Sequence, residues 1–304
     1  MKNIIVSGAT GFIGKSVVKE LVSNGYNVTA LVREPEKEEI HYIDGASYVK
    51  FSLENASEDL LKLQGTEYDT FFHFAWAGSA GEARVDYELQ MKNVGWTVEC
   101  LLAAKQLGCE RFINSGSIME KEAYDATFSR GNRPGLSYIY GTAKLACHSI
   151  CKAQAAKAGI DFINPMITNA YGIGEVSPRM VNTTLRKCIN GESPTFTAGT
   201  QNYDFVYIDD VARAFRLIGE NGKPFCEYII GSGQAKPLKE FLLEMKAEVA
   251  PGLDFIFGDI TYTGISQDIS FFDTSETERD TGFRAETGFA AGCKKTYNWL
   301  KENM

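Results

Sequence analysis

The sequence predicts an α/β fold in which a doubly wound parallel sheet is accompanied by a smaller carboxyl-terminal lobe. Three observations lead to this expectation. Short apolar runs alternate with longer helical patterns in the first half of the chain, a glycine-rich turn follows the first run directly, and the regular alternation stops after Pro165. Strands that alternate with helices in this way pair in parallel, because each helix returns the chain to the same edge of the sheet.

The expected strands are short runs of apolar residues at 4–6, 26–32, 48–51, 70–74, 111–114 and 160–163. A helix is expected from Phe12 to about Asn24, because its apolar residues largely share one side and Asn24-Gly25 is a common carboxyl-terminal cap. A second long helix is expected over 138–158, which is alanine-rich and nearly free of helix breakers. These elements complete successive β-α-β steps.

Two lobes are expected in a chain of 304 residues. The larger lobe consists of residues 1–165, and we expect 209–230 to return to it through a helix at 209–220 and a strand at 225–230. The smaller lobe then consists of 166–208 and 231–304, where glycine and proline interrupt short segments.

Composition excludes several classes of partner. The net charge of -8 gives no support for binding to nucleic acid or to an anionic membrane, so a small molecule is the expected partner. The seven cysteines form no C-x-x-C pair and only three histidines accompany them, so no metal site is expected. The chain shows neither a signal peptide nor an apolar run of about 20 residues, and we therefore expect a cytoplasmic protein.

A glycine-rich turn lies between the first predicted strand and the first helix. Gly8, Gly11 and Gly14 are three residues apart, so backbone N–H groups and the positive end of the helix face the same point. This context predicts a Rossmann-type lobe that binds the pyrophosphate of NAD or NADP along residues 8–14, including Thr10, Phe12 and Ile13. The alternative is a glycine-rich turn that binds nothing.

The end of the second strand favours NADP over NAD. An acidic side chain at this place accepts the ribose 2'-hydroxyl of NAD, whereas an arginine accommodates the 2'-phosphate of NADP. Here apolar Val32 is followed by Arg33, whose guanidinium can pair with a phosphate. Glu34 keeps open the alternative that Arg33 only solvates the strand end, so NAD remains the second choice.

Tyr140 and Lys144 form a pair that can exchange protons. They are four residues apart on the predicted helix, so both side chains lie on one face. A neighbouring ammonium stabilises a phenolate and so makes proton transfer by a tyrosine easier. Ser117, just past the strand at 111–114, can hydrogen-bond the same carbonyl oxygen. Taken alone, the pair is better explained as an exposed aromatic residue beside a solvated charge.

The combination resembles the extended short-chain dehydrogenase/reductase family, of the NAD-dependent epimerase/dehydratase type. Gly8-x-x-Gly11-x-x-Gly14, Ser117 and Tyr140-x-x-x-Lys144 occur in the family's order. Further matches, which extend the resemblance over nearly the whole chain, are 69–75, Asn93, 169–172 and 204–212.

This resemblance implies roles for individual residues. Ser117, Tyr140 and Lys144 would be catalytic, with Tyr140 exchanging the proton on the substrate oxygen while hydride moves to or from the nicotinamide. Lys144 would also hold the nicotinamide ribose, and Phe74, Ala75 and Asn93 would lie along the cofactor. The substrate-binding candidates are Trp76, Asn169 and Arg179. Relatives commonly form homodimers through paired long helices.

The residues after Ser117 narrow the choice among the reactions that this family catalyses. Sugar 4,6-dehydratases carry an Asp-Glu pair there, but this chain has Ile118-Met119, and Glu120 is expected to point elsewhere. Reduction of a 4-keto nucleotide sugar and redox-neutral epimerisation with a tightly bound cofactor remain. Arg33 favours dissociable NADPH and hence reduction, and 228–241 resembles deoxysugar 4-ketoreductases.

One departure from the family's pattern leaves the substrate class open. Tyr203 stands where many sugar-nucleotide enzymes have an arginine that binds the substrate diphosphate. Arg179, Arg186 or Arg284 could compensate, or the substrate could be a small ketone or aldehyde. Some relatives bind NADP without catalysis, but they tend to lose the tyrosine that this chain retains.

Overall fold

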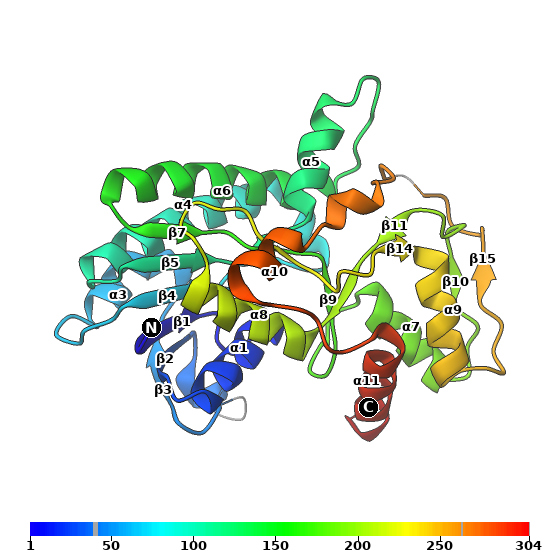
Figure 1. Ribbon diagram of the computed structural model, residues 1–304, viewed down its shortest axis with the longest axis horizontal. Coiled ribbons are helices and arrows are strands. Elements are labelled where there is room, and N and C mark those ends of the chain that lie inside the picture. Colours follow the sequence, from blue (N-terminus) through cyan, green and yellow to red (C-terminus); the bar gives the residue numbers. More distant parts are fainter. Residues whose placement is uncertain (39–41, 263, 304) are drawn as a thin grey trace.

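The computed structural model describes residues 1–38, 42–262 and 264–303. Its centre is a parallel six-stranded sheet in the order β3-β2-β1-β4-β5-β7 (Figure 1). The strands are β1 (Asn3–Ser7), β2 (Asn27–Val32), β3 (Ala46–Lys50), β4 (Thr70–His73), β5 (Arg111–Asn114) and β7 (Asp161–Ile163). The predicted α/β class and the doubly wound parallel sheet are confirmed.

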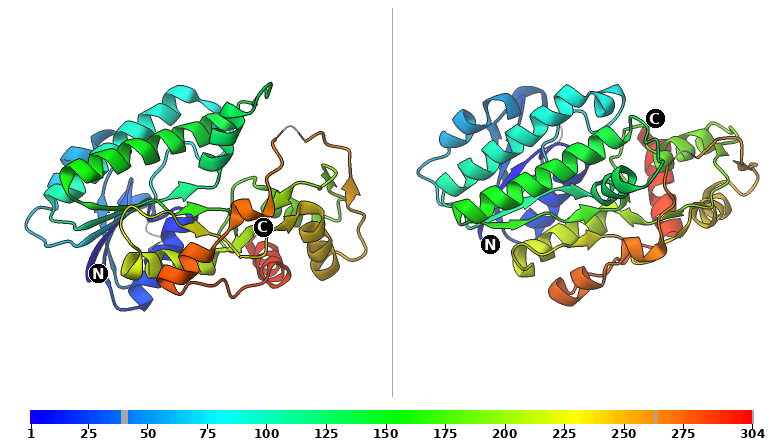
Figure 2. Two further views of the ribbon diagram at one scale, coloured as in Figure 1. Left: turned by 45° about the horizontal axis from the view of Figure 1, so that its top comes forward. Right: turned by 90° about the horizontal axis from the view of Figure 1, so that it is seen from above.

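Helices cover both faces of this sheet (Figures 1 and 2). On one face lie α3 (Ala56–Leu61), α4 (Tyr87–Gln106) and α6 (Tyr138–Ala158), and on the other lie α1 (Phe12–Ser23) and α8 (Ile208–Asn221). Each face of the sheet has its own apolar core. One core contains buried residues of α1 and α8, and the other contains buried residues of α4 and α6. Cys147 and Cys151 of α6 are buried free thiols in the second core.

The helix ends follow from local sequence. α1 ends at Ser23, just before Asn24 and a left-handed Gly25 with φ +81°. α6 ends at Ala158, and its C-cap residue Gly159 adopts the left-handed conformation with φ +66°. Glycine adopts this backbone conformation without a steric penalty, so both predicted helix ends are confirmed.

The sheet reverses its direction of winding between β1 and β4. The chain builds outward from β1 to β3 and then returns to place β4 on the other side of β1. Crossover connections leave the two strands in opposite directions there, which opens a crevice at the carboxyl ends of the strands. The glycine-rich turn lies at the carboxyl end of β1 and therefore at this crevice.

Small sheets and further helices complete the fold. A three-stranded parallel sheet contains β6 (Gly116–Ser117), β8 (Met166–Ile167) and β13 (Ile229–Ile230), and β9 (Asn169–Tyr171) pairs in parallel with β12 (Phe205–Tyr207). The remaining short strands are β10 (Thr195–Phe196) with β15 (Ile256–Phe257), and β11 (Asn202–Tyr203) with β14 (Lys236–Pro237). The remaining helices are α2 (Pro35–Glu38), α5 (Met119–Phe128), α7 (Met180–Ile189), α9 (Leu238–Val249), α10 (Ser275–Thr281), α11 (Phe289–Asn303), and the 3-10 turns η2 (Leu53–Asn55), η3 (Glu82–Val85) and η4 (Ile269–Phe272).

The expected return of residues 209–230 to the larger lobe stays a prediction, but the structure shows the two elements on which it depends. The helix is present as α8, which packs against α1, but the expected strand at 225–230 is reduced to Ile229–Ile230 and pairs with β8 in the smaller sheet. Phe225 has φ +61°, a conformation outside the β region, so an extended strand cannot begin there. The division into two lobes remains a prediction. None of the helices in the described residues has the length and apolar character needed to span a bilayer.

Candidate active site

The glycine-rich turn is compact enough to exclude side chains at two positions. Gly8 has φ +66°, and a Cβ atom there would lie 2.7 Å from the backbone nitrogen of Ala75. A Cβ atom on Gly14 would lie 2.1 Å from the carbonyl oxygen of Gly8. Gly8 therefore permits close approach between the turn and the end of β4, and Gly14 permits close contact between α1 and the turn.

The amino terminus of α1 is open to an anion. Gly11 is the N-cap residue and supplies no side-chain acceptor, so the first-turn N–H groups are not capped by the residue that usually caps them. These donors lie at the carboxyl end of β1, beside the crevice. Residues 8–14 therefore fit the pyrophosphate of a dinucleotide, whose negative charge the positive end of the helix dipole stabilises.

Arg33 lies where a ribose phosphate could reach it. β2 ends at buried Val32, and the exposed side chain of Arg33 follows directly. This is the position that selects between the two dinucleotides in Rossmann-type folds. The placement agrees with the expected role, and NADP preference remains a proposal.

His73, at the end of β4, is buried and fully hydrogen-bonded. Thr97 Oγ1 donates to the carbonyl oxygen of Asn93, so it accepts a hydrogen bond from His73 Nε2 at 3.2 Å. His73 Nδ1 then accepts from Ser7 Oγ at 2.9 Å. This chain of donors is satisfied by a neutral imidazole with its proton on Nε2. Burial, with a smaller contribution from the Lys144 charge, lowers the pKa of His73 to about 3.

Asn93, on α4, holds the segment that follows β4. Its Oδ1 accepts from Ala77 N at 2.7 Å, and its Nδ2 donates to the carbonyl oxygens of Ala77 and Leu89. The side chain is buried, so it fixes the course of the chain after Phe74 and Ala75, which lie against Gly8. The structure thus gives Asn93 an indirect role on the cofactor side, through the loop that it orders.

Tyr140 and Lys144 lie together on α6, and Trp76 packs against both. Lys144 Nζ donates to the carbonyl oxygen of Ser115 at 2.9 Å and lies 3.7 Å from the ring centroid of Trp76. The Trp76 ring meets the Tyr140 ring edge-on at 6.1 Å between centroids. Trp76 is not among the described residues that line the two cavities below, so its placement favours a role in orienting Tyr140 and Lys144 over the predicted substrate contact.

A cavity of about 310 Å³ brings some of the predicted catalytic and substrate-binding residues together. Ser117 and Tyr140 line it, and so do Asn169 and Arg179, whereas Lys144 and Trp76 are not among its described lining residues. A second cavity of about 220 Å³ extends from it along β9, β12 and α7. Asn169 and Arg179 line both cavities, so they lie between the predicted catalytic side chains and the second cavity.

The cavity also contains residues that the sequence did not single out. Arg84, on η3, lies 4.0 Å above the centroid of the Tyr140 ring. Glu122, on α5, lines the same wall, and burial raises the pKa of its carboxyl, with Arg84 opposing the shift. Burial also raises the pKa of Tyr203 to about 12. One signal for Arg84 was available, since it is the only basic residue in the segment 74–91 that follows β4.

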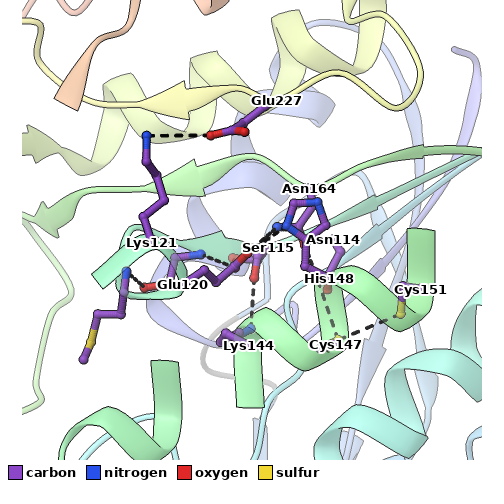
Figure 3. A network of polar contacts seen from close by, with 12 residues as sticks. Asn114, Ser115, Glu120, Lys121, Lys144, Cys147, His148, Cys151, Asn164 and Glu227 are labelled. Carbon is purple, nitrogen blue, oxygen red and sulfur yellow. Dashed lines mark hydrogen bonds and ion pairs between the residues drawn. The ribbon is translucent and has the colours of Figure 1, made fainter. Parts of the chain in front are cut away.

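Ser117 N donates into a buried polar network, whose members Glu120, His148, Asn164 and Asn114 are labelled in Figure 3. Glu120 Oε1 accepts from Ser117 N at 2.8 Å, and Glu120 Oε2 lies 2.9 Å from His148 Nδ1 on α6. Asn164 Nδ2 donates to both carboxylate oxygens, and Asn164 Oδ1 accepts from Asn114 Nδ2. The Glu120 carboxylate therefore points into the interior, away from the cavity that Ser117 lines, as the sequence led us to expect.

Comparison with known proteins agrees with this geometry. The model of the NAD dependent epimerase/dehydratase family matches residues 4–231. CDP-abequose synthase of Salmonella typhimurium is 26% identical over 269 residues, covering 84% of this chain and 83% of that protein.

Solved structures superpose over nearly the whole chain. MoeE5, solved in complex with UDP-glucuronic acid and NAD, is 26% identical with a TM-score of 0.78 and covers 99% of this chain and 100% of that one. UDP-glucose 4-epimerase of Thermotoga maritima, solved with UDP-glucose, is 22% identical with a TM-score of 0.81 and covers 99% of both chains. The chain therefore belongs to the NAD-dependent epimerase/dehydratase family, of the extended short-chain dehydrogenase/reductase type.

Proposed function

We propose that the protein reduces the 4-keto group of a nucleotide sugar with NADPH. The observation that carries this proposal is that Ser117 and Tyr140 line one cavity while Lys144 lies one helical turn behind Tyr140. Arg33 at the end of β2 supports a dissociable NADPH as the cofactor.

The chemistry follows from the side chains. NADPH supplies the hydride that is added to the carbonyl carbon. Tyr140 Oη donates its proton to the carbonyl oxygen, so the C=O group becomes CH–OH and Tyr140 is left as a phenolate. Ser117 Oγ hydrogen-bonds the same oxygen and orients it. The buried ammonium of Lys144 stabilises the phenolate until solvent returns the proton.

Dehydration is not favoured by the residues that directly follow Ser117. Elimination of water needs an acid and a base beside the hydroxyl residue, and Ile118 and Met119 supply neither. Glu120 is committed to Ser117 N, Asn164 and His148 in the interior. Reduction needs Ser117 and Tyr140, which line the cavity, and Lys144, which lies one turn behind Tyr140 on α6.

A redox-neutral epimerase is the second candidate. The specific observation in its favour is MoeE5, which is 26% identical and was solved with NAD and a UDP sugar. An epimerase would keep its cofactor bound and would oxidise and re-reduce one carbon. A reductase of a small ketone or aldehyde and a non-catalytic NADP-binding protein have weaker support, since the cavity extends beyond Tyr140 and the catalytic residues are retained.

A cofactor-consumption assay separates these candidates. Purified protein is incubated with NADPH and either nucleotide 4-keto sugars, nucleotide hexoses or simple ketones, and NADPH absorbance and sugar products are both followed. We expect stoichiometric NADPH loss only with the 4-keto sugars. Interconversion of nucleotide hexoses without NADPH loss would instead identify an epimerase, and NADPH loss only with simple ketones would identify a small-ketone reductase.

We also propose that the protein is a cytoplasmic homodimer that pairs through its long helices. Leu102 on α4 and Ile150 on α6 are exposed apolar side chains on these helices. Their burial against a second copy would remove apolar surface from water.

A further inference from the structure

The two cavities meet at a pair of arginines. Arg84, Asn169, Arg179 and Tyr203 line both of them. One cavity leads to Ser117 and Tyr140, and the other leads along β9, β12 and α7. A ligand that extends from the catalytic side chains into the second cavity therefore passes both guanidinium groups.

Arg84 is held in place but retains donors for a ligand. Its Nη1 donates to the carbonyl oxygen of Ser79 at 2.8 Å, its Nη2 contacts Met119 Sδ at 2.6 Å, and its plane lies against the Tyr140 ring. A guanidinium has five N–H donors, so these contacts leave several unused. Among the described residues, no carboxylate oxygen lies within ion-pair distance of Arg84, although Glu122 lines the same cavity.

Two arginines and two glutamates, Glu122 and Glu175, line the two cavities, but the arginines are only loosely paired with them. Arg179 makes one loose ion pair, with 3.6 Å between its Nε and Glu175 Oε2. Burial lowers the pKa of Arg84, and the like charge of Arg179 lowers it further, while burial raises the pKa of Glu122. Two guanidinium groups that face one half-buried space without full compensation favour an anion between them.

We propose that Arg84 and Arg179 together bind the diphosphate of the nucleotide-sugar substrate and replace the arginine that is absent at Tyr203. This inference takes the substrate class from the proposed function. The sugar then points toward Ser117 and Tyr140, and the nucleoside lies in the second cavity, which Tyr203 and Phe205 line. A bidentate guanidinium matches two phosphate oxygens, so each arginine holds one phosphate.

The other two arginines considered from the sequence are engaged elsewhere. Arg284 is exposed and pairs with Glu278. Arg186 Nε donates to Asn182 Oδ1 at 3.2 Å. Neither is among the described residues that line the two cavities. Arg84 was not considered from the sequence, because only the fold brings η3 over Tyr140.

Calorimetric titration tests the proposal without any turnover. NADP-saturated wild-type protein, Arg84→Gln and Arg179→Gln are titrated with UDP and CDP, with the matching nucleosides, and with glucuronate. Arg284→Gln is the matched control, since it removes a guanidinium outside the cavities. Arg84→Lys keeps the positive charge but loses the paired N–H donors of the guanidinium. The melting temperature and the NADP affinity of each variant show whether it is folded.

We expect each glutamine variant to bind the preferred nucleoside diphosphate about 10- to 100-fold more weakly than wild type, the range for loss of hydrogen bonds to a charged group. Nucleoside affinity and the Arg284→Gln control should stay unchanged, and Arg84→Lys should fall between. Wild-type affinity for both diphosphates in Arg84→Gln would overturn the proposal. Glucuronate binding that depends on Arg84, without diphosphate binding, would overturn it in favour of a sugar carboxylate site.

The outcomes also separate this inference from the proposed function. Diphosphate binding that depends on both arginines, in a protein that never consumes NADPH with 4-keto sugars, would sustain the subsite and refute the reductase. NADPH consumption with unchanged diphosphate binding in Arg84→Gln would support the reductase and refute the diphosphate subsite.

Discussion

Tyr140 is the residue on which the proposed proton transfer depends. Tyr140→Phe keeps the ring that packs on Trp76 and Arg84 but removes Oη. General acid catalysis contributes about 10²- to 10⁴-fold, so we expect turnover to fall by at least about 100-fold. NADPH affinity, measured by fluorescence titration, should stay close to wild type. Turnover near the wild-type rate in this variant would refute the catalytic assignment.

Arg33 is the residue expected to set cofactor preference. It follows the last residue of β2 and is exposed, so Arg33→Ala should leave the fold unchanged. We expect wild-type protein to bind NADPH more tightly than NADH and the variant to lose most of this difference, because the 2'-phosphate loses its guanidinium partner. Parallel titrations of both cofactors measure the ratio. Equal affinities in the wild-type protein would exclude the NADP preference.

His73 links protonation to stability. Its pKa is about 3 in the folded protein, below the ordinary value of 6.5. Below pH 6.5 the unfolded chain takes up a proton that the folded protein refuses, so stability falls as the pH drops from 6.5 toward 3. The loss is about 1.4 kcal/mol per pH unit. Urea unfolding at several pH values should show a shallower pH slope for His73→Gln than for wild type, and equal slopes would contradict the account.

At the scale of elements, α5, α6 and β6 are joined through the Glu120 carboxylate. Glu120→Ala leaves the buried donors of Ser117 N and Asn164 Nδ2 without acceptors, at a cost of about 1–3 kcal/mol for each. We expect melting temperature and kcat both to fall, because Ser117 loses its support. Glu120→Gln keeps an amide carbonyl oxygen that can accept from Ser117 N. Its kcat should therefore lie between those of Glu120→Ala and wild type.

The kinetic measurement distinguishes positioning from general support. Assays are made at a temperature where every variant is folded, and kcat and KM are determined separately. A positioning role predicts a lower kcat at nearly constant KM in Glu120→Ala, with partial recovery in Glu120→Gln. A drop in melting temperature alone, with wild-type kcat, would show that Glu120 only stabilises the fold.

For the whole molecule, the parts predicted from sequence are those built from neighbouring residues. The turn at Gly8–Gly14 lies within one strand-turn-helix unit, and Tyr140 and Lys144 share one helix face. Their order along the chain, together with Ser117, indicated the site. Arg84 reaches Tyr140 only through tertiary contact, and the Glu120 network joins residues from separate elements. Such contacts leave no periodic signal in a single sequence.

The strand expected at 225–230 shows a different limit of prediction from sequence. Its apolar residues are buried as predicted at Ile229 and Ile230, but the backbone of Phe225 breaks the extended conformation. The hydrophobic pattern of a sequence indicates which residues are buried, whereas the backbone conformation of a single residue is decided by the surrounding fold. The same distinction explains why the smaller sheets of the second half were not foreseen.

The central claim is that this fold transfers hydride from a dissociable cofactor to a sugar carbonyl. The most direct measurement uses NADPH that carries deuterium at the transferred position, with a nucleotide 4-keto sugar, and locates the label by mass spectrometry and NMR. We expect deuterium on C4 of the product, one NADP formed per product, and no label transfer in Tyr140→Phe. Unlabelled product formed with the deuterated NADPH left intact would contradict the claim.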